Sequence, residues 1–200
     1  MRLTILFCLS LLLIAPAPAQ EQRPHIRLSP VEFVSVAARC APGAPADTLL
    51  AIAKTESGLN PNAISINHPK AVAGLAGHSD GELILARQAE NVKEAKSWLH
   101  WLSVHRYKVS VGLMQVNVET AEQFHLTPEQ LLDSCTNLRV AASILIRLYT
   151  ESARELGEGF SALDTALSLY NTGDSSMGFR NGYVASVYAH ADRPVPVLAH

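Results

Sequence analysis

The chain has 200 residues, of which 48% are hydrophobic, and carries a formal net charge of −2 at pH 7. This length is sufficient for one domain with a core of its own. The nearly balanced charge provides no electrostatic basis for binding nucleic acid or an anionic membrane surface, so we expect neither as a partner.

Residues 1–19 have the pattern of a signal peptide. Arg2 precedes an almost unbroken apolar run over residues 3–14, which is shorter than the about 20 apolar residues that a comfortable membrane span needs. Ala17-Pro18-Ala19 then has the small-x-small pattern of a signal-peptidase site. We expect cleavage after about Ala19, export to the periplasm and no integral membrane segment after cleavage. An uncleaved anchor is the alternative.

Cleavage leaves two cysteines, Cys40 and Cys135, in an oxidising compartment, which favours a single disulfide between them. Closing so long a loop stabilises a fold by roughly 4–5 kcal/mol on the chain-entropy model. Two buried free thiols are the alternative. The two cysteines do not have the spacing of a metal site.

The first predicted helix begins after the leader. Residues 29–32, Ser-Pro-Val-Glu, have the pattern of a helix start, because Ser29 can cap the helix and the glutamate can complete a capping box. The helix is predicted to place Val31, Val34 and Ala38 inward and to end near Cys40.

A second helix is predicted over about residues 45–57. Gly58 suits its C-terminal cap, and Asn60-Pro61 prevents its continuation. Residues 62–86 are rich in Gly, Asn, His and Pro, and we expect loops and a short β-hairpin there.

Helical periodicity dominates the rest of the chain. Val92, Ala95, Leu99 and Leu102 form one stripe of a helix predicted over residues 88–104. The following segments are a short, partly extended stretch at 109–117 and helices near 118–124, 128–133, 137–156, 161–170 and 181–190. The fold class is therefore mainly α with a small β element. We expect one domain at 29–190, with a short leader at 20–28 and a C-terminal tail at 191–200.

Glu56 is the most informative residue of the second helix. The apolar stripe of this helix is Leu49, Ile52 and Ala53, and the next position on it is 56. A carboxyl group at the edge of a core loses hydration, which raises its pKa, and the helix C-terminus acts in the same direction. An acid that keeps its proton near neutral pH suits general acid catalysis. Alternatively, the helix ends at Glu56 and the side chain turns to solvent.

Three short motifs follow one another along the chain: Glu-Ser-Gly-Leu-Asn-Pro at 56–61, Gly-Leu-Met-Gln-Val-Asn at 112–117 and Tyr-Asn-Thr-Gly at 170–173. In this order they resemble the motifs of the lytic transglycosylases in the goose-type lysozyme-like, SLT-domain superfamily. The resemblance is strongest to the small exported members that accompany type IV secretion and conjugation systems, and covers residues 30–190. It implies an α+β lysozyme-like fold with a cleft.

The resemblance also implies roles for the residues of the first two motifs. Glu56 takes the position of the catalytic acid and base, and Ser57 is expected to orient Glu56 or the substrate, or else is only a polar residue at a helix end. Gln115 and Asn117 match positions that line the glycan cleft, where amides can bind N-acetyl and hydroxyl groups. Alternatively, Asn117 only caps the following helix.

The third motif contributes Tyr170 and Asn171, which the resemblance places beside the acid, with Asn171 reaching the substrate. Tyr170 is alternatively a core aromatic residue. Tyr183 matches a further tyrosine of the cleft, with core packing as its alternative. Asp174 is the best candidate for a second carboxylate.

The remaining candidates favour structure over chemistry. Trp98 and Trp101 are interpreted as packing residues rather than sugar platforms, and no pair of histidines has the His-x-x-x-His spacing. We therefore expect no metal, and the reaction that the resemblance implies needs no cofactor.

By its resemblance the chain is expected to cleave the MurNAc–GlcNAc β-1,4 bond of peptidoglycan with formation of a 1,6-anhydro ring. The glycan strands are the expected partner, together with components of a type IV secretion system. The alternatives are a muramidase that hydrolyses the same glycan and a non-catalytic, peptidoglycan-binding assembly factor.

Overall fold

The computed structural model describes residues 27–67 and 85–191, and the predicted signal peptide, most of the leader and most of the tail lie outside them. The elements are α1 (Pro30–Cys40), α2 (Ala46–Ser57), β1 (Ile64–Ile66), α3 (Val92–Val104), β2 (Val109–Val111), β3 (Val116–Asn117), α4 (Val118–Glu122), the 3₁₀ helix η1 (Pro128–Leu132), α5 (Ser134–Leu156), α6 (Phe160–Thr172), α7 (Met177–Arg180) and α8 (Tyr183–Ala189). Within this part of the chain, no helix has the length and apolarity that crossing a membrane requires.

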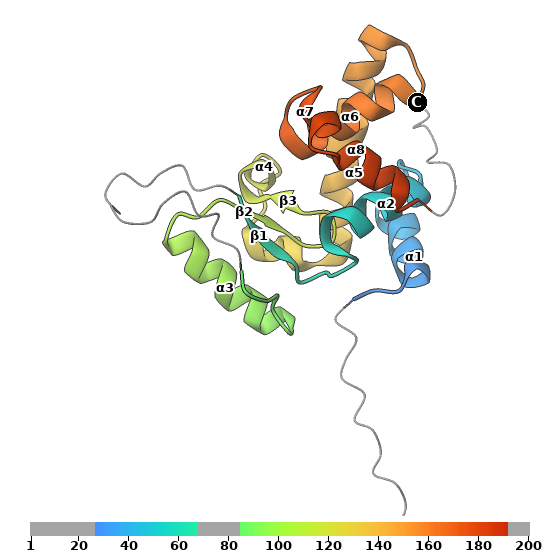
Figure 1. Cartoon of the computed structure of the whole chain (residues 1–200). Coiled ribbons are helices and arrows are strands. Elements are labelled where there is room, and N and C mark those ends of the chain that lie inside the picture. The colour runs from blue at the N-terminus through green and yellow to red at the C-terminus, as the bar shows by residue number, and fades with distance from the viewer. Residues whose placement is uncertain (1–26, 68–84, 192–200) are drawn as a thin grey trace, which may run out of the picture.

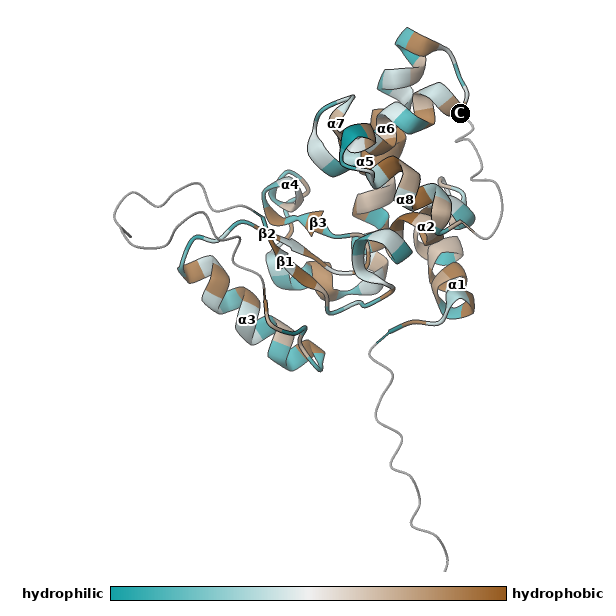
Figure 2. Ribbon diagram, viewed as in Figure 1, coloured by the Kyte–Doolittle hydropathy of each residue, from teal (hydrophilic) through white to brown (hydrophobic). Residues whose placement is uncertain are grey.

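The helices and the sheet occupy different sides of the molecule. In Figure 1 the sheet lies with α3 and α4 on one side, α1, α2 and α6–α8 gather on the other, and the long helix α5 runs between them. Apolar segments of α5, α6 and α8 meet in the second group (Figure 2). The predicted class, mainly α with a small β element, is confirmed.

The sheet has three antiparallel strands in the order β1-β2-β3. β1 pairs with β2 in the register Ile64↔Val111, and β2 pairs with β3 in the register Ser110↔Asn117. Of the hairpin predicted within 62–86, only β1 lies in the described residues, and its partner is β2. The tight hairpin is β2–β3, and its turn at 112–115 belongs to the second sequence motif.

The ends of α1 and α2 follow their capping residues. The capping box of α1 is formed, since the N–H of Glu32 donates to Oγ of Ser29 and the N–H of Ser29 donates to the Glu32 carboxylate. α2 ends at Gly58, which adopts the left-handed conformation with φ 57°. Arg27 of the leader donates to the carbonyl oxygen of Gly58 at 2.8 Å, so the leader is attached to the end of α2.

The inward face of α1 differs from the prediction. Val31 is 80% exposed and Ala38 is exposed, whereas Phe33 and Ala37 are fully buried. The helix is rotated because Phe33 has the largest apolar side chain of α1, and burying it removes the most apolar surface from water.

α3 begins at Val92 and not at 88, because Asn91 caps it by accepting from the N–H of Glu94 at 3.0 Å. Gln88 instead binds both backbone groups of Ile64. Ala95 and Leu99 are buried as predicted, while Val92, the first helical residue, is 47% exposed.

Two further elements depart from the predicted helices. The segment at 128–133 is a short 3₁₀ helix with its capping box formed. α7 was not predicted, and it follows a turn in which the Asp174 carboxylate accepts from the N–H groups of Ser176 and Met177.

The predicted disulfide is present. Cys40 at the end of α1 is bonded to Cys135 at the start of α5, across a sequence separation of 95 residues. It therefore ties α1 to α5.

Candidate active site

Glu56 lies in the last turn of α2 on the buried face of the helix. Leu49, Ile52 and Ala53 of that face are fully shielded from solvent, and Glu56 is partly buried at its end. The side chain therefore does not turn to solvent. Burial raises the pKa of Glu56 from 4.5 to about 7, in the direction predicted from the helix stripe.

Tyr183 is the hydrogen-bond partner of this carboxyl group. Its hydroxyl donates to Oε1 of Glu56 at 2.6 Å, and this bond acts against burial by lowering the pKa of Glu56. Tyr183 is the first residue of α8 and is 8% exposed. Its backbone N–H donates to Oδ1 of Asn181, which fixes the start of the helix.

The charge of Glu56 acts on Tyr170, but the Tyr170 hydroxyl donates to another residue. Its hydroxyl donates to the carbonyl oxygen of Met114 at 2.8 Å. Burial, followed by the negative charge of Glu56, raises the pKa of Tyr170 well above its usual value. Tyr170 therefore keeps its proton and remains a donor.

The loop at 112–115 connects the three sequence motifs. Oγ of Ser57, next to the acid, lies 2.8 Å from the carbonyl oxygen of Leu113 and 3.1 Å from that of Ala53. Tyr170, from the third motif, donates to the next carbonyl group of the same loop. The first and third motifs thus meet on the backbone of the second.

The sequence model of the family "Transglycosylase SLT domain" matches residues 33–189. The chain belongs to the transglycosylase SLT domain family.

Three relatives of this SLT domain are proteins of similar name. It is 36% identical to "Protein virB1" of Agrobacterium fabrum over 94% of this chain and 69% of the relative. It is 34% identical to "Protein virB1" of Rhizobium radiobacter over 86% of this chain and 65% of the relative. The third is "Type IV secretion system protein virB1" of Brucella suis biovar 1, 32% identical over 84% of this chain and 68% of the relative.

The SLT domain chain thus spans about two thirds of the length of these relatives, with 65% coverage of the Rhizobium protein. No solved structure gives a significant match to it.

Gln115 of the SLT domain is bound by protein groups on both sides of its amide. Its Oε1 accepts from Oγ of Ser65 at 2.6 Å, and its Nε2 donates to the carbonyl oxygens of Gly112 and Ala63. The residue has a positive φ of 46° and ties the turn of the hairpin to β1. Its expected contact with substrate stays a prediction.

Asn117 and Asn171 are held by one side-chain atom each. Oδ1 of Asn117 accepts from the N–H of Glu119 at 2.8 Å and caps α4, as the alternative interpretation has it. Its Nδ2 has no hydrogen-bond partner among residues 27–67 and 85–191, so it can donate to a ligand. Oδ1 of Asn171 accepts from Nδ2 of the neighbouring Asn181.

The sheet adds three polar residues that sequence analysis missed, Ser65, Asn67 and Ser110, beside the predicted Asn117. Ser65, Ser110 and Asn117 are directly paired across the three strands, so they share one face of the sheet. Asn67 extends this face by bonding Oγ of Ser110. In the sequence, these polar residues alternate with Ile and Val within three short segments, and this alternation was the signal that could have identified them.

Asn137 is a second residue that sequence analysis missed. It is fully buried, and its side chain binds the backbone of Met114, Val111 and Leu131. Its position on a stripe with Ala141, as for Glu56 on α2, was the signal that could have identified it.

Asp174 does not accompany Glu56. It is exposed, and its carboxylate accepts from the N–H and hydroxyl of Ser176 and from the N–H of Met177, which lowers its pKa. It is therefore an ionised group that holds a turn.

The tryptophans of α3 pack as predicted. Trp101 is 51% exposed and stacks on His105 and Tyr107, with ring centroids 4.0 and 5.9 Å away. Trp98 lies beneath the guanidinium of Arg87 at 5.1 Å. In the described part of the chain, no group of three His, Cys, Asp or Glu side chains is arranged to hold a metal ion.

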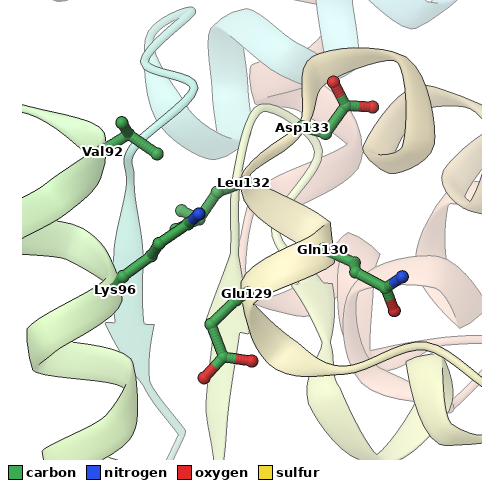
Figure 3. Close-up of a pocket in the computed structure, with 6 residues that line it drawn as sticks. All are labelled: Val92, Lys96, Glu129, Gln130, Leu132 and Asp133. Carbon is green, nitrogen blue, oxygen red and sulfur yellow. The ribbon is translucent and has the colours of Figure 1, made fainter.

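A separate cavity of about 420 Å³ lies between α3 and η1 (Figure 3). In this view Lys96 reaches from α3 toward η1. The lining contains none of the predicted site residues and consists of Val92, Lys96, Glu129, Gln130, Leu132 and Asp133. The candidate site is therefore the arrangement around Glu56.

Proposed function

We propose that the chain is a lytic transglycosylase that cleaves the MurNAc–GlcNAc β-1,4 bond of peptidoglycan. The observation that carries this proposal is the partly buried Glu56, whose pKa of about 7 leaves it both protonated and ionised near neutral pH. One residue can then act first as an acid and afterwards as a base. Membership of the transglycosylase SLT domain family supports the same reaction.

In the first step the protonated carboxyl group of Glu56 donates its proton to the glycosidic oxygen. The bond between this oxygen and C1 of MurNAc breaks, and the GlcNAc side leaves with a hydroxyl group. Positive charge develops at C1, and the 2-acetamido group of the substrate stabilises it. Glu56 is left as a carboxylate that accepts a hydrogen bond from the hydroxyl of Tyr183.

In the second step the Glu56 carboxylate removes the proton from the C6 hydroxyl of the same MurNAc. The C6 oxygen bonds to C1 and closes the 1,6-anhydro ring, and Glu56 is again protonated. The two steps return every proton and consume no water. Most glycosidases use a second carboxylate, and Asp174 is engaged in its turn instead.

The polar face of the sheet fits a glycan that carries acetamido and hydroxyl groups. Asn117 presents its Nδ2 donor, and Oγ of Ser65 keeps a free lone pair while it donates to Gln115. We propose that this face binds sugar rings beside the bond that Glu56 cleaves.

The relatives give the proposed setting. Because proteins of the type IV secretion system are among them, we propose that the chain acts in the periplasm and opens the wall locally for such an apparatus. The predicted signal peptide is consistent with this place of action.

The test is digestion of purified peptidoglycan by the mature chain, residues 20–200, beside Glu56→Gln, with mass spectrometry of the released muropeptides. Anhydro-muropeptides from the wild type alone support the proposal. Products heavier by one water indicate a muramidase. Release by neither protein, with binding to the wall retained, indicates an assembly factor.

A further inference from the structure

Asn137 is a fully buried polar side chain that the proposed reaction does not use. It lies in the first turn of α5, and backbone groups occupy both ends of its amide. Oδ1 accepts from the N–H of Met114 at 2.9 Å, and Nδ2 donates to the carbonyl oxygens of Val111 at 2.8 Å and Leu131 at 3.0 Å. Because a lost partner would leave a buried group unpaired, these bonds fix the backbone strongly.

The loop at 112–115 is pressed against this amide. Gly112 has a φ of 82°, and a Cβ atom there would lie 2.4 Å from Nδ2 of Asn137 and 2.6 Å from the carbonyl oxygen of Leu131. The loop can take this position because glycine has no side chain. Its back is therefore held in contact with Asn137.

Carbonyl groups of the loop accept hydrogen bonds from the first and third motifs. The N–H of Met114 donates to Oδ1 of Asn137 and its carbonyl oxygen accepts from the Tyr170 hydroxyl, so a single residue of the loop connects the two side chains. The carbonyl oxygen of Leu113 likewise accepts a hydrogen bond from Oγ of Ser57. Any movement of the loop therefore moves the acceptor that holds the Tyr170 hydroxyl.

We propose that Asn137 is a positioning residue for the transglycosylase reaction: it holds the loop so that Tyr170 donates to Met114 and not to Glu56. The inference rests on the proposed function for its reaction. With Asn137 in place, the Glu56 carboxyl accepts a hydrogen bond from Tyr183, while the Tyr170 hydroxyl donates to the carbonyl oxygen of Met114.

The consequence of losing Asn137 follows from the charge beside Tyr170. The loop that holds Tyr170 also holds Ser57, the neighbour of Glu56 in α2, and the negative charge of Glu56 acts on the Tyr170 phenol. We therefore expect the Glu56 carboxylate to become the acceptor of this hydroxyl once Met114 moves away. A second hydroxyl donor stabilises the ionised carboxylate and lowers its pKa. Glu56 would then be a weaker source of protons at neutral pH.

The experiment compares the wild type with Asn137→Ala, Tyr170→Phe and the double variant, each as the mature chain. Release of anhydro-muropeptides is measured as a function of pH, and the Glu56 carboxyl is titrated by NMR in protein with labelled glutamate. For Asn137→Ala we expect kcat to fall by about tenfold or more, the alkaline limb to move to lower pH, and Glu56 to titrate lower. In the Tyr170→Phe background the shift should vanish, because no hydroxyl remains to be redirected.

Tyr149→Phe is the matched control. It removes a buried hydroxyl that accepts from the N–H of Gly159 at the α5–α6 turn, and it should lower stability without moving the pH profile. If Asn137→Ala does not fold, Asn137→Asp takes its place: it keeps the volume and the acceptor for Met114 but places a carboxyl oxygen against the carbonyl oxygens of Val111 and Leu131, which should displace the loop and move the Glu56 titration in the same direction.

An unchanged titration of Glu56, or an equal shift with and without the Tyr170 hydroxyl, would overturn the inference. A wild type that releases no anhydro product overturns the proposed function alone, because the titration still reports where Tyr170 points.

Discussion

The hydroxyl of Tyr183 donates to Oε1 of Glu56 at 2.6 Å, and this bond opposes burial in setting the acidity of the carboxyl group. Burial favours the neutral acid and the bond favours the carboxylate, with burial the larger effect. The resulting pKa of about 7 lies where a group can donate a proton and then take one back.

Replacing Tyr183 by Phe should therefore raise the pKa of Glu56. Activity that needs the protonated acid falls as pH rises through this pKa, so the alkaline limb of the pH–rate profile should move to higher pH. Tyr188→Phe is the control, because it removes a hydroxyl from the same helix that donates to Asp164 instead. An alkaline limb that stays in place in Tyr183→Phe would show that the bond does not set the acidity.

Glu56→Gln should abolish activity and stabilise the fold at alkaline pH. The acid–base contribution corresponds to a loss of roughly 10²–10⁴-fold. The pKa of Glu56 is about 7 in the folded chain against 4.5 for the ordinary group, so folding binds protons between these values. Wild-type stability therefore falls as pH rises from 4.5 to about 7, by about 3 kcal/mol, and the glutamine variant lacks this loss.

Urea denaturation at a pH above 7 and near 4.5 measures the difference. The variant should exceed the wild type at the higher pH and match it more closely at the lower one. Glu122→Gln, which neutralises an exposed side chain of α4, is the control. A glutamine variant that is less stable than the wild type at alkaline pH would contradict the burial of a destabilising charge at this position.

Local signals in the sequence predicted the acid and its helix. Gly58 ends α2 as expected, and the periodicity of Ile52 and Ala53 places Glu56 on the inner face. Both are properties of a few adjacent residues and of the helical repeat. The capping box of Ser29 and Glu32 was predictable for the same reason.

The partners of the acid could not be predicted in this way. Tyr183 is 127 residues from Glu56 in the chain, and its role depends on the packing of α8 against α2. The same holds for Asn137, which is an ordinary helical residue until β2 and the 112–115 loop pack on it. Phe33 was missed on α1 because several faces of that helix offer apolar residues, and only the tertiary contacts select one.

Gly112→Ala tests how closely the loop packs against its support. The added Cβ would lie within 3 Å of Asn137 and Leu131 and would require a positive φ, so both overlap and strain apply. We expect a loss of roughly 2–5 kcal/mol in the free energy of unfolding. Gly182→Ala is the control, because its φ of 81° is almost the same, it lies in the left-handed region, and nothing lies within 4 Å of the added atom.

Thermal or urea denaturation of the two glycine variants separates these contributions. Gly182→Ala should lose only the strain of the backbone, roughly 1–2 kcal/mol. Equal losses for both variants would mean that the loop yields easily and that Asn137 does not hold it.

The disulfide between Cys40 and Cys135 should make a large contribution to stability. It closes a loop with a separation of 95 residues, and removal of both cysteines by Cys40→Ser and Cys135→Ser should lower the free energy of unfolding by about 4–5 kcal/mol. Calorimetry with and without reductant provides the measurement, and the double variant should not respond to reductant. If the wild-type stability does not change when the disulfide has been shown to be reduced, the prediction is wrong.

Asn117 carries two separable functions on its two side-chain atoms. Oδ1 caps α4 by accepting from Glu119, whereas Nδ2 is available to a sugar in the proposed site. Asn117→Asp keeps the acceptor and removes the donor, so it should preserve stability and raise KM for glycan strands. Asn117→Ala removes both, so it should also lower the free energy of unfolding by about 1 kcal/mol. Kinetics on soluble glycan strands and denaturation of both variants decide the matter: a KM unchanged in Asn117→Asp would leave Asn117 as a cap alone and remove it from the glycan site.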